Sequence, residues 1–301
     1  MGIKKLRKKH EYPNINDHVL EEILKRCGKY IIKIDSKLDT TKKWKKTIEA
    51  TLNLLLFDKY CPNIQSITCK NSKGVGIYCF KNIKEFNVGY IYHETSCFYI
   101  CQETETLSDC MSKFLFNHKN LQVFGLIVNI HNRDVSGSSC TCLMGAWWSL
   151  PLEELTTFEL LGNYDYLEKE VTNFIKGSKK IRTLSLNLYG NMITAISSSC
   201  FNLIELSLRN EFKFRNIDRE LSQIFINNKN LRSLKLENFL YMTGECLLSL
   251  NKNVIENVKL ARAGHFQSEY FICLSSWKKL HSLTIHVFSL NDFSYLAESV
   301  S

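Results

Sequence analysis

KNLRSLKL, residues 229–236, is the stretch that decides the fold of this 301-residue chain. It places aliphatic residues at its third, sixth and eighth positions, with variable residues between them. The last two aliphatic residues are separated by one residue, so they are expected to share one face of a short β-strand. Close copies are FNLIELSL at 201–208 and KKLHSLTI at 278–285. A chain that repeats such a phrase is expected to fold as a series of similar units.

The pattern L-x-x-L-x-L, with other apolar residues allowed at the marked positions, recurs along most of the chain. Six clear copies begin at Ile64, Ile181, Leu203, Leu231, Ile255 and Leu280. Four weaker copies begin at Ile31, Ile83, Leu121 and Leu155. The later copies start about 22 to 28 residues apart, which lies within the range of a leucine-rich repeat.

An amphipathic helix is predicted ahead of several copies. Apolar residues recur at helical spacing in segments 217–225 and 167–175, and helices are also expected within 47–63 and 18–29. One helix–turn–strand unit cannot close its own core, but stacked units can. We therefore predict an α/β leucine-rich-repeat solenoid, an arc with parallel strands on the concave face and helices on the convex face. An ordinary α/β domain is the alternative.

The chain shows little material for a flexible linker, because it has only 3 prolines and 13 glycines. We predict two parts: a basic N-terminal tail over residues 1–17, and one leucine-rich-repeat domain of about ten irregular repeats over 18–301. The apolar fraction of 45% is enough to build a large core and excludes a disordered chain.

Several segments resemble the cysteine-containing leucine-rich repeats of F-box/leucine-rich-repeat proteins. YCPNIQSITC (60–69) and CFNLIELSL (200–208) match the Cys-x-Asn-Leu segment that leads into a strand. FLYMTGECLLSL (239–250) and, more loosely, NMITAISS (191–198) resemble the segment that begins the next helix. HVLEEILKRCGKYIIKIDS (18–36) looks like the first repeat that follows the F-box.

This resemblance implies the substrate-binding part of a cullin-type ubiquitin ligase, in which the F-box binds the adaptor and the arc binds the substrate. The sequence departs from the family because only 17 residues, seven of them charged, precede the first repeat, and they contain no F-box pattern. Binding of the ligase adaptor is therefore expected only if an F-box lies upstream. The alternative is a stand-alone regulatory or scaffolding repeat protein unrelated to ubiquitin.

The predicted concave face is the candidate binding surface for a protein partner. Its variable strand positions carry mixed charge, which suits specific recognition of a protein, although any such strand shows polar residues to water. The candidate partner-binding residues are Glu205, Arg209, Lys235, Glu237, Lys259 and His286, and Ser207, Ser233, Asn257, Ser282 and Thr284 lie beside them.

A loop predicted over residues 131–151 interrupts the repeat and carries the adjacent Trp147 and Trp148. Two interpretations stay open. Tryptophan is enriched at interface hot spots, so both residues are candidates for partner binding. Alternatively, one or both fill the core where a repeat is irregular.

The net charge is +9, and much of it lies near the N-terminus. The run KKLRKK (4–9) is a candidate nuclear-import signal or nucleic-acid tail, and the simpler reading is a solvated terminus. Nucleic-acid binding is disfavoured, because no aromatic stacking platform accompanies this charge.

Other classes find little support in the sequence. The 12 cysteines form no C-x-x-C pair, so neither a zinc site nor another cofactor is expected. No signal peptide and no apolar run long enough to span a membrane is found, which favours reduced thiols in a cytoplasmic or nuclear protein. No catalytic motif is present, so we do not expect an enzyme.

Overall fold

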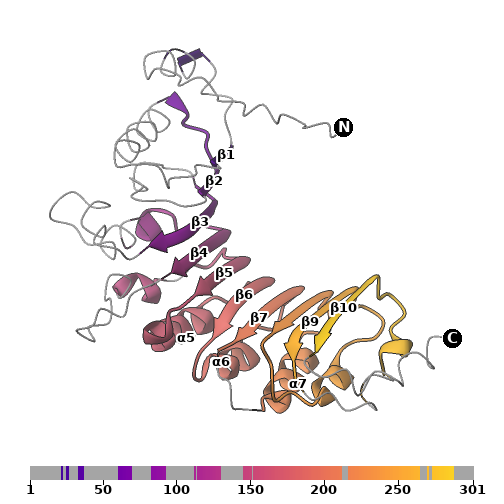
Figure 1. Cartoon of the computed structure of the whole chain (residues 1–301). Coiled ribbons are helices and arrows are strands. Elements are labelled where there is room, and N and C mark those ends of the chain that lie inside the picture. The colour runs from indigo at the N-terminus through magenta and orange to yellow at the C-terminus, as the bar shows by residue number, and fades with distance from the viewer. Residues whose placement is uncertain are drawn as a thin grey trace, which may run out of the picture.

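The fold is described from a computed structural model of the chain (Figure 1). The structure describes residues 22, 25–26, 33–36, 60–69, 83–92, 112, 114–129, 145–150, 152–211, 216–264, 270 and 273–287. Within these ranges ten strands form one parallel sheet, and each strand lies beside its neighbour in the sequence. The strands are β1 Lys33–Ser36, β2 Ser66–Cys69, β3 Glu85–Tyr92, β4 Val123–Asn129, β5 Thr157–Gly162, β6 Thr183–Leu188, β7 Glu205–Asn210, β8 Ser233–Glu237, β9 Asn257–Ala263 and β10 Ser282–Val287.

Every copy of the repeated phrase, clear or weak, forms one of these strands. Each strand begins two residues after the first aliphatic residue of its copy, as β8 does after Leu231. Because the order of the strands in the sheet is their order in the sequence, each unit adds one strand beside the previous one. The sheet curves into an arc (Figure 1), and the predicted α/β leucine-rich-repeat solenoid is confirmed.

The helices lie along the outer, convex side of the curved sheet (Figure 1). The α-helices with described bounds are α5 Glu168–Gly177, α6 Met192–Ser199 and α7 Asp218–Asn227, and the 3-10 helices are η3 Ala146–Ser149, η4 Asp165–Leu167, η5 Glu245–Ser249 and η6 Cys273–Ser276. The helix predicted over 217–225 is α7, and the one over 167–175 is η4 followed by α5. The expected helices within 18–29 and 47–63, and the tail 1–17, lie almost wholly outside the described residues.

The unit after β8 has a 3-10 helix where the sequence predicts the start of an α-helix. Gly244, which precedes η5, has a φ of 94°, a left-handed conformation that glycine adopts without the steric cost of a Cβ. The chain thus turns sharply before Glu245, and only one short helical segment fits before β9.

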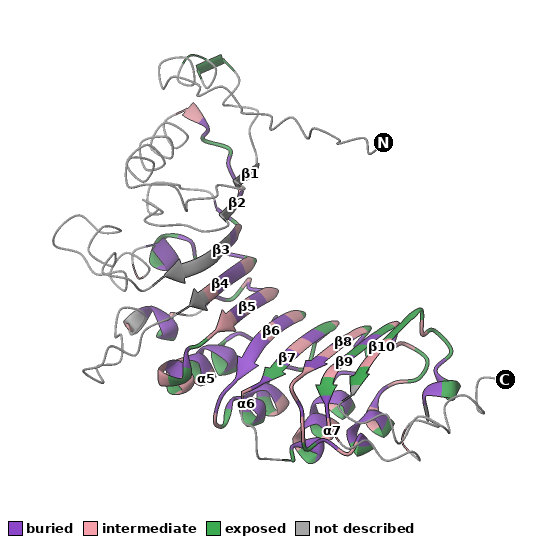
Figure 2. Cartoon of the chain, viewed as in Figure 1, coloured by how far each residue is buried: buried purple, intermediate pink, exposed green. Residues whose placement is uncertain are grey.

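The core lies between the strands and the helices, as the buried residues in Figure 2 show. One inward row of the sheet continues from Ile67 of β2 to Phe86, Phe124 and Phe158, and neighbouring phenylalanine rings lie 6.3 and 6.0 Å apart between centroids. From β6 onward the same row continues with the smaller Leu184, Leu206, Leu234 and Val258. The core is therefore aromatic around β3 to β5 and aliphatic further along.

Asn228, in the turn before β8, joins two successive units. Its side chain is buried, its Nδ2 donates to the carbonyl oxygens of Cys200 at 2.8 Å and Ile224 at 2.9 Å, and its Oδ1 accepts from the backbone N–H of Leu203 at 2.7 Å. Cys200 occupies the same place one unit earlier and is also buried. These turns therefore hold the strands at a fixed spacing where they begin.

Candidate protein-binding surface on the concave face

The sheet register aligns the variable strand positions in rows across the concave face. The row through the middle of the strands contains Glu159, Ser185, Ser207, Lys235, Lys259 and Thr284. The next row, nearer the strand ends, contains Asn187, Arg209, Glu237, Ala261 and His286. Side chains that are 22 to 28 residues apart in the sequence therefore become neighbours on one surface.

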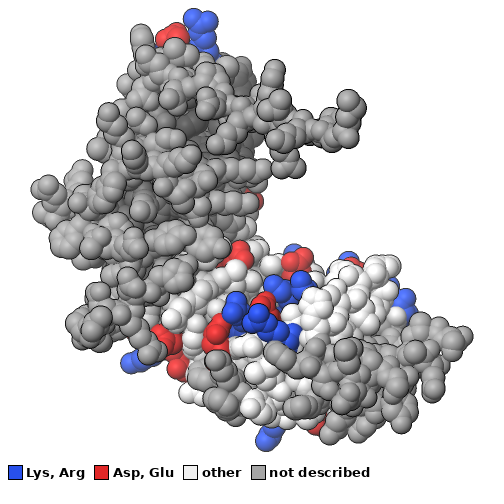
Figure 3. All heavy atoms as spheres, viewed as in Figure 1, with Lys and Arg blue, Asp and Glu red and all other residues white. Residues whose placement is uncertain are grey.

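Four of these side chains, together with Glu211 just beyond β7, form a connected polar chain over β6 to β8. Asn187 Nδ2 donates to Glu211 Oε1 at 2.9 Å, and Arg209 Nε lies 3.0 Å from the same oxygen. Arg209 Nη1 is 3.9 Å from Glu237 Oε1, and Lys235 Nζ is 3.7 Å from Glu237 Oε2. Because each ion pair is partly exposed, it adds little stability. Together they hold positive and negative side chains in defined positions. Figure 3 shows basic and acidic residues gathered side by side on the described surface that faces the viewer.

A groove of about 580 Å³ runs over this cluster. Its wall includes Glu159, Arg209, Lys235 and Glu237, and its β5 end includes the apolar side chain of Leu161. Burial raises the pKa of the Glu159 carboxyl above its ordinary value, while the positive charge of Lys235 acts in the opposite direction. The groove therefore holds a partly desolvated carboxyl beside an arginine and a lysine.

The structure brings three of the predicted binding residues together, namely Arg209, Lys235 and Glu237. Lys259 lies next to Lys235 in register and is exposed, and it has no ion-pair or hydrogen-bond partner among the described residues. Glu205 and His286 lie on the same face but at its margins: Glu205 in the row where the strands begin, and His286 on β10. Both are exposed.

The two predicted tryptophan contacts are wrong. Trp147 is 0% exposed and Trp148 is 2% exposed, and their rings stack 3.9 Å apart within the core. Trp148 also meets the ring of Phe174 of α5 edge-on, with centroids 5.6 Å apart. Both side chains lie in η3, where they fill the core as the second interpretation proposes, so neither can touch a partner. Residues 131–144 of the predicted loop lie outside the described residues.

Sequence reasoning missed Glu159, Asn187 and Glu211. Glu159 stands at the variable position of the weak copy LTTFEL, which corresponds to Ser207 and Lys235 in the clear copies. Applying the register of the clear copies to the weak ones would have found it. Asn187 directly follows the copy IRTLSL, at the position that Arg209 and Glu237 occupy after their copies, so the same register would have found it. Glu211 lies beyond the end of β7, where the repeated phrase gives no signal.

Within the described ranges, no three His, Cys, Asp or Glu side chains gather closely enough to hold a metal ion. The same part of the chain has no helix that is long and apolar enough to cross a membrane. Cys61, Cys200 and Cys246 are buried free thiols.

The repeated units and the parallel sheet define a leucine-rich-repeat solenoid whose concave face carries a charged groove. A structural comparison gives the leucine-rich repeat-containing protein LegL7 from Legionella pneumophila, with a TM-score of 0.45 and 15% sequence identity. The match covers 96% of this chain and 95% of that chain. No model of a protein family matches the sequence, and no curated protein matches it.

Proposed function

We propose that this chain is a protein-recognition module that binds its partner in the concave groove over β5 to β8, without a covalent step. The observation that carries the proposal is the connected cluster of Arg209, Glu237 and Lys235 beside the desolvated carboxyl of Glu159. Fixed charges of both signs on one surface favour a partner with complementary charges and disfavour other partners.

The exposed cation of Lys259 extends this surface towards β10. Because it lacks a partner among the described residues, it is available to pair with an acidic group of a bound protein. Arg209 and Lys235, by contrast, are already oriented by Glu237 and Glu211. A partner that binds here would meet prearranged charges, which reduces the entropy lost on binding.

A capture experiment with a matched control tests this function. The tagged full-length chain is used to capture partners from an extract of its own source cells, and the captured proteins are identified by mass spectrometry. Each partner is then measured against a concave variant carrying Arg209→Glu, Lys235→Glu and Lys259→Glu. The control carries Lys169→Glu, Lys176→Glu and Arg219→Glu, which make the same charge change at exposed positions of α5 and α7.

We expect at least one captured partner to bind the helix-side control as well as the unchanged chain but not to bind the concave variant. Circular dichroism should show that both variants keep their folded signal, because all six positions are on the surface. A partner that binds the concave variant as well as it binds the unchanged chain would contradict the proposed surface.

We further propose that this module is the substrate-binding part of a cullin-type ubiquitin ligase in the cytosol or nucleus. The support is the resemblance to cysteine-containing repeats, together with the buried positions of Cys61 and Cys200 in equivalent turns before β2 and β7. In the same capture experiment, recovery of a cullin and its adaptor supports this assignment. Reproducible recovery of another partner without them supports a stand-alone scaffold instead.

A further inference from the structure

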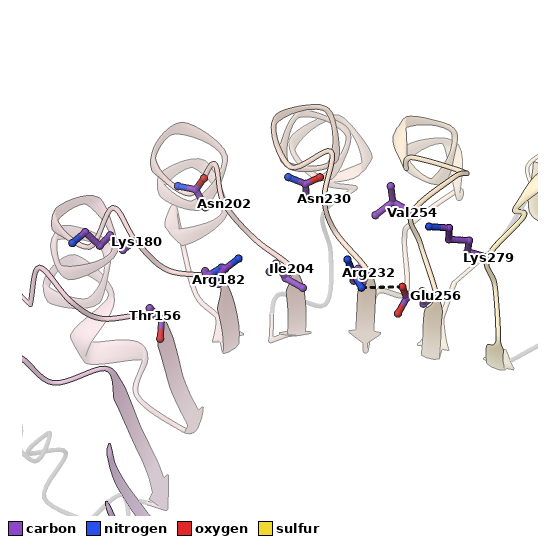
Figure 4. A pocket seen from close by; sticks show the side chains of 10 residues that line it. All are labelled: Thr156, Lys180, Arg182, Asn202, Ile204, Asn230, Arg232, Val254, Glu256 and Lys279. Atoms are coloured by element: carbon purple, nitrogen blue, oxygen red, sulfur yellow. Dashed lines mark hydrogen bonds and ion pairs between the residues drawn. The ribbon is translucent and has the colours of Figure 1, made fainter. Parts of the chain in front are cut away.

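A second groove follows the edge of the sheet at which the strands begin, and it shares no lining residue with the groove of the concave face. It has a volume of about 620 Å³ and runs from the unit of β5 to that of β10. Figure 4 shows its two walls. The wall formed by the turns carries Lys180, Asn202, Asn230, Val254 and Lys279, and the wall formed by the residues before the strands carries Thr156, Arg182, Ile204, Arg232 and Glu256.

This edge is strongly basic, whereas the charges on the concave face are mixed. The turns and pre-strand positions of the units from β5 to β10 contain eight cationic residues and only three carboxylates. The cations are Lys179, Lys180, Arg182, Lys229, Arg232, Lys252, Lys278 and Lys279, and the carboxylates are Glu153, Glu154 and Glu256. Such an excess produces a positive potential along the edge, which attracts an acidic partner.

One cation without a partner among the described residues lies near each end of the groove. Lys180 pairs with Glu154 at 2.7 Å, and Arg232 pairs with Glu256 at 3.3 Å. Arg182, before β6, and Lys279, before β10, have no ion-pair or hydrogen-bond partner for their side chains among the described residues. An acidic ligand could therefore pair with both without breaking an existing ion pair.

The middle of the groove has no net charge, because Arg232 and Glu256 pair with each other there, and it is rigid. Asn202 and Asn230 offer amide groups, and Ile204 and Val254 offer apolar surface. The backbone at the strand-start wall is tied in a ladder: the N–H of Ile204 donates to the carbonyl of Arg182 at 2.7 Å, and that of Arg232 donates to the carbonyl of Ile204 at 2.8 Å. Amide side chains can hydrogen-bond the N–H and C=O groups of an extended peptide that lies between the walls.

We propose that this groove binds an extended, acidic polypeptide segment of a partner protein. Arg182 and Lys279 are separated by four strand intervals, or roughly 19 Å at the usual strand spacing. An extended chain covers that distance with about six residues. The segment would therefore carry two acidic residues about six positions apart, with uncharged polar and apolar residues between them. Lys229 and Lys252, exposed on the outer side of the turns, attract the segment from a distance.

A nucleic-acid strand fits the groove less well. Its phosphates carry a charge at every nucleotide, and those in the middle would meet an Arg232 that is already paired with Glu256 and the apolar side chains of Ile204 and Val254. In addition, the residues that line the groove include no aromatic side chain on which a base could stack.

Fluorescence anisotropy with the full-length chain tests the proposal. Three labelled nine-residue peptides serve as probes: one has two glutamates six positions apart, one has two glutamates three positions apart, and one has glutamines in place of the glutamates. A labelled single-stranded 20-nucleotide DNA is the fourth probe. We expect the six-position peptide to bind tightest. The variant Arg182→Glu with Lys279→Glu should weaken that binding about tenfold, because two exposed ion pairs are replaced by repulsion.

The matched control carries Lys169→Glu and Lys176→Glu, which make the same charge change at exposed positions of α5. It should bind the peptide as the unchanged chain does. Equal loss in both variants would overturn the proposal, because attraction would then follow net charge alone. Equal binding of all three peptides would overturn it too. So would a DNA that binds the unchanged chain more tightly than any peptide does and binds the Arg182→Glu, Lys279→Glu variant more weakly. Because this groove is separate from the concave cluster, these outcomes leave the test of the proposed function unaffected.

Discussion

The carboxylate of Asp218, the first residue of α7, accepts hydrogen bonds from Thr243 in the following unit. Its Oδ2 accepts hydrogen bonds from the backbone N–H of Thr243 at 2.7 Å and from the hydroxyl of Thr243 at 2.9 Å. The other oxygen, Oδ1, accepts from the backbone N–H of Cys246 at 3.4 Å. Asp218 is 5% exposed, so these bonds satisfy a buried charge and fasten the α7 unit to the η5 unit.

The substitution Asp218→Asn should lower the free energy of unfolding by about 1–3 kcal/mol. The asparagine amide has only one oxygen that can accept hydrogen bonds, so at least one buried N–H or O–H donor would lose its partner. Urea denaturation followed by circular dichroism measures the loss. Glu245→Gln, at an exposed position of η5, is the control and should change the free energy by less than about 0.5 kcal/mol. Equal effects of the two substitutions would show that the bonds to Thr243 do not stabilise the fold.

The substitution Trp148→Ala should destabilise the fold by about 3–5 kcal/mol, because it opens a cavity between Trp147 and Phe174. Thermal and urea unfolding measure this loss, and the milder Trp148→Phe gives a folded variant if the alanine variant does not fold. Phe201→Ala, at a side chain that is 52% exposed, should have little effect. A loss below about 1 kcal/mol for Trp148→Ala would contradict the placement of this ring in the core.

Glu159 should make stability depend on pH in the mildly acidic range. Burial raises the pKa of its carboxyl in the folded chain, so the folded state holds this proton more tightly than the unfolded state does. Stability should therefore fall as the pH rises from the ordinary pKa of glutamate through the raised one. Denaturant midpoints measured across this range for the unchanged chain and for Glu159→Gln give the difference. The glutamine variant should lack this decrease and gain in relative stability at neutral pH, and parallel curves would refute the assignment.

Cys200 should be almost inert to alkylation in the folded chain. Burial raises the pKa of its thiol to about 12, while the Lys179 charge acts weakly in the opposite direction. At pH 8 the reactive thiolate should be roughly a thousandfold rarer than for an ordinary cysteine. Iodoacetamide labelling followed by peptide mass spectrometry compares Cys200 in native and urea-unfolded protein. Native labelling as fast as labelling in urea would contradict the buried position.

The structure confirms what depends on local periodicity. The alternation of apolar residues in LRSLKL determines which side chains of β8 face the core, because successive side chains of a strand point to opposite faces. The same rule places Arg209, Lys235 and Glu237 on the concave face, as predicted. Even the weak copies, such as LTTFEL before and within β5, follow the rule.

The fate of the two tryptophans could not be deduced from the sequence. Two adjacent tryptophans next to a Gly- and Ser-rich stretch are as compatible with an exposed interface hot spot as with side chains that fill the core. What decided between them is the space between η3, the phenylalanine row and α5, which Trp147 and Trp148 fill by stacking on each other and against Phe174.

The sequence by itself determined the repeating unit, the parallel order of the strands and the face on which each variable residue lies, because these follow from spacing within one unit. Only the tertiary structure decided which polar side chains interact across units, such as Asp218 with Thr243, Lys235 with Glu159, and Arg232 with Glu256. These contacts depend on the distance between neighbouring units and on the burial of each side chain, and those are fixed only when the whole stack packs together.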